Sequence, residues 1–230
     1  MPSHLVPDAA VALRRPWGNK MTISYPLNLP TVKVARHVNF RKQSTVAISA
    51  SSFTHEQQVY VHQGEWWEAD VQLPPMQRAN AETWIGFLLA LNGREGTFLM
   101  GDPVGETPRG IATGVPVVDG GSQTGKTLRT RGWTQNTAGI LLSGDWLQFG
   151  SGSSAHLHKM VQDADVDLGS PVLDVASLEI WPRLRSSPAN GDAIIVSAAK
   201  GLWRLSSNVS QWSIDEAVIF GIEFSCEEAL

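Results

Sequence analysis

The sequence is short of cysteine, of charge and of long apolar runs. Of its 230 residues, one is a cysteine and 17% are charged, and the formal net charge is −4. A single cysteine, Cys226, excludes an internal disulfide framework and any CxxC metal site. Its position in an alternating apolar segment predicts a small buried core residue. So few Lys and Arg residues make tight nucleic-acid binding a poor interpretation, because that binding needs many phosphate contacts.

No segment has the length of a membrane span, since the longest apolar run, residues 84–91, makes about two helical turns. The first twenty residues lack the charged start and apolar stretch of a signal peptide. Their three prolines predict an extended N-terminal arm over residues 1–20. The alternative is that Met21 is the natural start and the arm is extra translated sequence.

What the sequence has in abundance is two-residue alternation of apolar and polar side chains, which is typical of half-buried strands. Residues 31–41 and 44–49 show it, and so do two runs on either side of residues 62–65, the segment His-Gln-Gly-Glu. We therefore expect a hairpin over about residues 57–73 that turns at 62–65. Its polar outer face carries Glu68, Asp70 and Gln72.

One helix and a long closing strand complete this first region. Trp84, Leu88 and Leu91 have helical spacing, which predicts a helix near 78–91 that Asn92-Gly93 closes in a left-handed cap. Apolar residues alternate without a break over 218–226. This pattern matches the first region, so we expect the last strand to return to the first sheet.

Residues 105–199 have a different composition and a different strand pattern. A stretch rich in Gly, Pro and Thr is followed by about five short strands, which is typical of a small barrel of the SH3 or OB type. The predicted fold is therefore mainly β. Residues 21–104 and 200–230 form an antiparallel β-sandwich or barrel with one flanking α-helix, and 105–199 form an inserted small β-barrel domain.

Residues 120–127 read GGSQTGKT and match the phosphate-loop pattern. A working phosphate loop leaves a buried strand and opens a helix. The segment before it carries Pro116, and the segment after it is rich in Gly and Thr. The motif therefore lacks both the preceding buried strand and the following helix. We interpret the motif as a β-turn with Lys126 and Thr127 at the start of a strand.

Other candidate chemical sites are equally weak. His156 and His158 can share one strand face as a metal pair near Asp163 and Asp165, but a zinc site needs further ligands, so solvent-facing or interface histidines are favoured. No GxSxG, HExxH or paired Cys and His motif is present. We expect no catalytic residues, no metal, no cofactor and no enzymatic activity.

Nine tryptophans are a high count. Tryptophan usually anchors a core or a subunit interface. The candidate interface anchors are Trp17, Trp66, Trp203 and Trp212. Exposure of Trp133 or Trp146 on a groove would favour a carbohydrate- or peptide-binding module, whereas burial of both would favour a plain core.

The order of these features resembles a known family. The stretch from YPLNLP through HQGEWWEADVQLPPMQRANAETWIGFLLALNGREGTFLMGDP, followed by GDWLQFG, LHKMVQDADVD, LEIWPRLRSSPANGD, KGLWRLSSN and EEAL, is similar to distal tail proteins of long-tailed (siphovirus-type) bacteriophages. The resemblance covers about residues 25–230. It depends on order and extent, because each motif consists of ordinary structural residues.

The resemblance implies a virion protein at the tail tip, made in the host bacterial cytoplasm. Six copies would form a ring that joins the tail-tube protein to the hub and tip proteins, with a sheet related to the tail-tube fold. DNA would pass through the ring without specific binding, and Glu68, Asp70 and Gln72 would face this lumen. Alternatives are a tail-tube or hub component, a host-surface carbohydrate- or peptide-binding module and, weakest, a nucleotide hydrolase.

Overall fold

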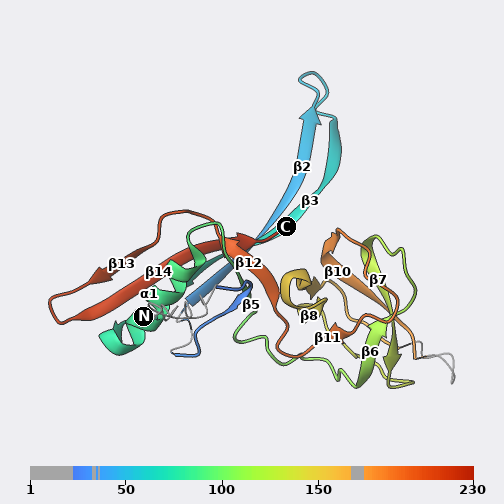
Figure 1. The fold of residues 1–230 in the computed structure, drawn as a ribbon. Coiled ribbons are helices and arrows are strands. Elements are labelled where there is room, and N and C mark those ends of the chain that lie inside the picture. Colours follow the sequence, from blue (N-terminus) through green and yellow to red (C-terminus); the bar gives the residue numbers. More distant parts are fainter. Residues whose placement is uncertain (1–22, 33–34, 36, 167–173) are drawn as a thin grey trace, which may run out of the picture.

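The computed structural model describes residues 23–32, 35, 37–166 and 174–230, so the predicted N-terminal arm and Trp17 lie outside the described residues. Within these ranges the chain is mainly β and carries one α-helix, α1 (Arg78–Leu91). The strands form a larger sheet of eight strands and a smaller sheet of six, and Figure 1 shows the two side by side. The predicted fold class is confirmed.

The larger sheet combines both ends of the described chain. Its order is β1 (Leu27–Asn28), β5 (Thr97–Met100), β12 (Gly201–Leu205), β14 (Ile219–Glu228), β3 (Gln57–Gln72) and β2 (His37–Ala50), and β4 (Met76–Gln77) and β13 (Gln211–Ile214) pair with β14 off this path. The terminal strand β14 pairs antiparallel with β3 and β12. Its return to the first sheet is therefore confirmed.

The hairpin predicted to turn at residues 62–65 is wrong. β3 runs through this segment as one strand of 16 residues and pairs with the 14 residues of β2, and the chain turns instead between Ser51 and Glu56. The Ser51 hydroxyl accepts hydrogen bonds from the backbone N–H groups of Phe53 and Thr54, both at 3.3 Å. A serine side chain that satisfies the backbone in this way favours a turn without any glycine.

Gly64, which suggested the turn, has another role in β3. The register shifts between Ser44 and Val46 of β2, and this irregularity brings Thr45 against Gly64. A Cβ atom on Gly64 would lie 2.6 Å from Oγ1 of Thr45. The glycine therefore allows close approach of the two strands at a bulge.

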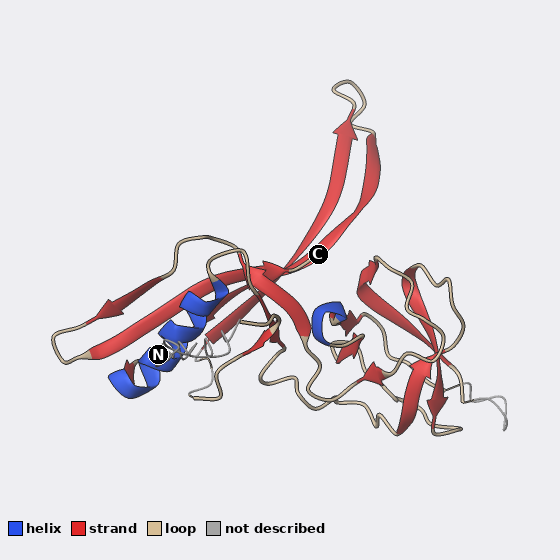
Figure 2. Cartoon of the chain, in the orientation of Figure 1, coloured by secondary structure: helices blue, strands red, loops and turns tan. Residues whose placement is uncertain are grey.

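The helix α1 begins and ends as predicted and covers one face of the larger sheet (Figure 2). Trp84, Leu88 and Leu91 are buried against the sheet, and the Trp84 indole donates a hydrogen bond to the Val32 carbonyl at 2.7 Å. Asn92 has φ 51° and closes the helix in the left-handed conformation.

The smaller sheet has the order β11 (Ile194–Ile195), β8 (Trp146–Phe149), β9 (His156–Met160), β10 (Ala176–Leu184), β7 (Gly125–Trp133) and β6 (Gly114–Val118), with a 3₁₀ turn at Gly152–Ser154. A bridge between Val117 and Ala193 brings its two ends together, so the sheet is nearly a closed barrel around its own core. The domain boundaries at 105 and 199 stay a prediction.

A tryptophan cluster joins the two sheets. Trp67 of β3 packs against Trp146 and Trp181 of the smaller sheet, with ring centroids 5.0 and 4.3 Å apart. Its indole N–H donates to the Leu157 carbonyl at 3.1 Å. These contacts place β8, β9 and β10 against the middle of β3.

Candidate assembly surfaces

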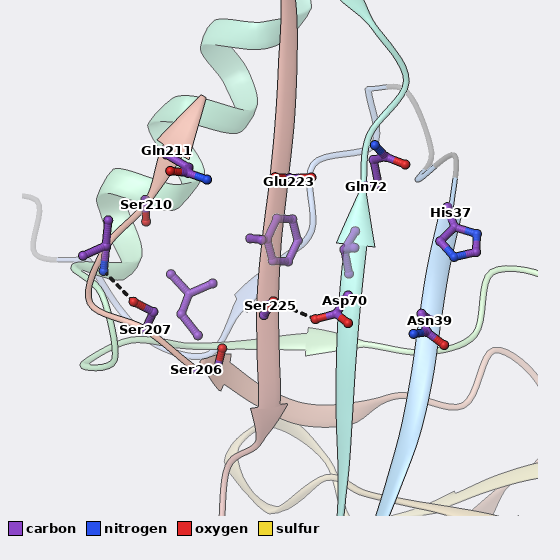
Figure 3. A pocket seen from close by; sticks show the side chains of 14 residues that line it. His37, Asn39, Asp70, Gln72, Ser206, Ser207, Ser210, Gln211, Glu223 and Ser225 are labelled. Atoms are coloured by element: carbon purple, nitrogen blue, oxygen red, sulfur yellow. Dashed lines mark hydrogen bonds between the residues drawn. The ribbon is translucent and has the colours of Figure 1, made fainter. Parts of the chain in front are cut away.

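The predicted lumen residues lie on the outer face of the larger sheet. Trp67, Ala69 and Val71 of β3 point into the core, so the intervening Glu68, Asp70 and Gln72 point away from it. Two of them, Asp70 and Gln72, border a shallow polar groove of about 670 Å³. Figure 3 shows the polar side chains that line it: His37, Asn39, Asp70, Gln72, Ser206, Ser207, Ser210, Gln211, Glu223 and Ser225.

This outer face is less acidic than β3 alone indicates, because Arg41 of β2 lies among its carboxylates. Arg41 forms ion pairs with Asp70 and, at 3.5 Å, with Glu68. The Ser225 hydroxyl hydrogen bond and the Arg41 guanidinium hold the pKa of Asp70 below its ordinary value. The alternation over residues 31–41 predicts a strand but gives no sign that β2 lies beside β3 in this register.

The four predicted interface tryptophans separate into different environments. Trp203 is fully buried, and its indole donates to the Met100 carbonyl at 3.0 Å, so its assignment as an interface anchor is wrong. Trp66 is half-buried on the outer face and donates to Glu68 at 3.2 Å. Trp212 on β13 is 40% exposed. Trp17 lies outside the described residues.

Trp133 and Trp146 are both buried in the described chain, each 3% exposed. The Trp133 indole donates to the Thr130 hydroxyl at 2.8 Å, and the Trp146 indole donates to Asp102 at 2.9 Å. Neither ring is free to stack on a sugar or a peptide. This burial favours the core interpretation of both residues.

The GGSQTGKT segment is a loop followed by a strand. β7 begins at Gly125, and the Gln123 side chain binds the backbone on both sides of the loop, accepting from the Arg129 N–H and donating to the Asp119 carbonyl. The strand predicted from Lys126 is confirmed, with its start one residue earlier, and the segment before it is an irregular loop and not the predicted β-turn. Strand geometry after the motif lacks the helix N-terminus that holds phosphate in a phosphate loop.

Lys126 instead helps to join the two sheets through Glu65, which is 4% exposed. Its ammonium group lies 2.8 Å from Glu65, whose other oxygen accepts the Arg183 N–H at 2.9 Å. Nearby, Glu228 accepts from the Arg185 guanidinium and from the Trp67 N–H, both at 3.2 Å. Burial raises the pKa of Glu228, and Arg185 opposes that shift.

The two histidines do not lie free on the surface. His158 is buried, its Nδ1 lies 2.8 Å from the Pro182 carbonyl, and its ring stacks on Phe149. Burial lowers the pKa of His158 to about 3, so the ring is neutral. The prediction of a solvent-facing or interface residue is wrong for His158, because β9 turns it toward the interior. His156 is half-buried.

The two carboxylates predicted near the histidines accept hydrogen bonds from the backbone. Asp163 accepts the Ser143 N–H at 2.7 Å, and Asp165 accepts the Gly139 N–H at 2.6 Å. In the described part of the chain, no group of three or more His, Cys, Asp or Glu side chains is arranged to hold a metal ion. Cys226 is buried as predicted, and this burial raises the pKa of its thiol.

A row of exposed apolar side chains lies on a hairpin that the sequence did not single out. Residues 44–63 of β2, β3 and their turn project from the body as a β-arm (Figure 1). One face of this β-arm carries an apolar strip whose side chains are 47–64% exposed: Val46, Ile48, Val59 and Val61. Val46 lies opposite Val61 and Ile48 opposite Val59, so the four form two adjacent cross-strand pairs.

No protein-family model matches the chain, and no curated protein matches it. Among the described residues, no helix has the length and apolar character needed to cross a bilayer.

Proposed function

We propose that this chain is a structural virion protein that forms a ring at the distal end of a bacteriophage tail. The ring joins the tail tube to the tip and hub proteins, and DNA passes through its lumen without specific binding. The order of segments quoted above supports this proposal, and so does a sheet with one flanking helix and an added small barrel.

The single observation that carries the proposal is the uncovered strip on the β-arm. Val46, Ile48, Val59 and Val61 continue the alternation that buries Trp67 and Ala69 further along the same strands. Beyond the body, nothing in the described chain covers this face. A row of apolar side chains on a projecting hairpin marks a protein contact, and in a tail ring that contact is a neighbouring copy.

The alternatives predict different surfaces. A carbohydrate-binding module needs exposed aromatic rings along a groove. Half of the residues that line the polar groove beside Asp70 are Asn, Gln or Ser, and Trp133 and Trp146 are buried. A tail-tube or hub component would use the same sheet with other ring partners. The ring symmetry separates the hub component from the tail-tip ring, and the stacking of rings separates the tail tube from it.

The test is the mass of the purified protein in solution, together with negative-stain images. We expect a six-subunit ring with a central hole. A three-fold ring would favour the hub component, and a stack of rings would favour the tail tube. A protein that stays monomeric at concentrations up to about 100 μM would overturn the proposal, because a specific assembly associates more tightly than that.

A further inference from the structure

A second exposed apolar surface lies at the opposite end of the larger sheet from the β-arm. β13 pairs with the first half of β14, and its side chains Trp212 and Ile214 form a patch, with exposed fractions of 40% and 57%. Their cross-strand partners Ile222 and Phe220 are buried in the core. The patch therefore belongs to the same face of the sheet that α1 covers further along.

The strip and the patch share this face but cannot meet within one copy. β3 and β14 are antiparallel and pair only over residues 68–72 and 223–227, so the β-arm leaves one end of the pair and the β13–β14 hairpin leaves the other. Figure 1 shows the two hairpins pointing away from each other. The part of β3 between Val61 and Gln72 alone spans roughly 35 Å.

We infer that the strip on the β-arm of one copy packs on the patch of the next copy. This inference rests on the proposed function and names the contact that would close the ring. The strip and the patch are different surfaces, so their contact is head-to-tail, and repeated head-to-tail contacts form a ring when the rotation closes. Arm-to-arm packing would instead give a two-fold dimer.

The composition of the two hairpins fits an apolar contact between copies. Over residues 44–63, Glu56 is the one side chain with a full charge at pH 7. In the paired part of the β13–β14 hairpin, the charges are Asp215 and Glu216, which lie in the turn, and Glu223, which lies opposite Gln211 on the other face of the sheet from the patch. No like charges therefore oppose each other where the strip would meet the patch.

The experiment is cross-linking between two separately made variants, Ile48→Cys and Ile214→Cys. Cys226 is buried, so a short bis-maleimide reaches only the introduced thiols in the folded protein. We expect a covalent dimer in the mixture of the two variants. Ser49→Cys is the matched control, because Ser49 is also exposed but points to the opposite face of the β-arm. It should link to Ile214→Cys at least tenfold less.

The outcomes separate the inference from the proposed function. A ring by mass without the 48–214 link would overturn the inference and leave the ring proposal standing. The link in an open chain or a closed dimer would support the inference and overturn the ring. Ile48→Cys linking efficiently to itself would show arm-to-arm packing and overturn the inference, and a monomer without any link would overturn both.

Discussion

The ammonium group of Lys126 lies 2.8 Å from Oε1 of Glu65, a carboxylate of which 4% is exposed. Burial alone raises the pKa of Glu65, but the hydrogen bonds from Lys126 and from the Arg183 N–H outweigh it, and the net pKa is lowered. A group whose pKa is depressed by folding stabilises the folded state above its unfolded pKa. That contribution is lost as the pH falls through the folded value.

We therefore expect Lys126→Ala to lower the free energy of unfolding by about 1 kcal/mol at neutral pH, because Lys126 is half-exposed and its ion pair is partly screened. The loss should shrink at an acidic pH below the folded-state pKa of Glu65, where the protonated carboxyl group needs no cation. Urea titrations at both pH values measure the difference, with Lys126→Arg as the matched control that keeps the charge. An equal loss at both pH values would contradict this role for Lys126.

Residue types alone did not reveal which of these groups are buried. The sequence correctly excludes a phosphate loop around Lys126, because Pro116 before the motif and the glycines after it are local features. Trp203 and His158 were not placed correctly, because their burial depends on strands far away in the chain: β5 supplies the carbonyl that binds the Trp203 indole, and β10 supplies the one beside His158. Contacts of this kind have no local pattern.

At the scale of elements, periodicity located α1 and β14 but misplaced the turn between β2 and β3. Helical spacing and a left-handed Asn are local features, and an unbroken alternation marks a strand wherever it pairs. The predicted turn at residues 62–65 is wrong because a glycine such as Gly64 is compatible with a bulge as well as with a turn. The β-arm was missed for a related reason: its alternation is the same as that of the buried half of β3, so no pattern marks where the strand leaves the body.

The β-arm gives the clearest test at this scale. Ser44 lies opposite Glu65, so replacing residues 45–64 by Asn-Gly joins these partners with a tight hairpin turn. None of the removed residues is buried in either core. We expect a melting temperature within a few degrees of the full chain, since surface changes of this kind have little effect on stability, together with complete loss of assembly.

A milder variant keeps the β-arm but removes its apolar character. Val59→Thr with Val61→Thr preserves the β-branched shape and the strand preference of both positions. The midpoint concentration of assembly, measured by sedimentation, should rise at least tenfold. Undiminished assembly of the shortened protein would show that the β-arm is not an assembly element.

At the scale of the whole molecule, the chain has two kinds of surface with different responses to salt. The outer face of the larger sheet holds Arg41, Glu68 and Asp70 in exposed ion pairs. The strip and the patch hold aliphatic side chains and one indole. Salt screens contacts between exposed charges, whereas apolar burial is unaffected by screening and is strengthened by salts such as sulfate.

If copies meet through the strip and the patch, assembly should withstand salt. Raising sodium chloride from about 50 mM to about 500 mM, which shortens the Debye length severalfold, should leave the midpoint concentration within about twofold, and ammonium sulfate should lower it. Val61→Lys is the matched control, because a buried unpaired charge weakens the contact at every salt concentration. Dissociation of the assembly on adding sodium chloride alone would assign the contact to the charged outer face, where the predicted lumen residues lie, and would exclude the strip as the main source of affinity.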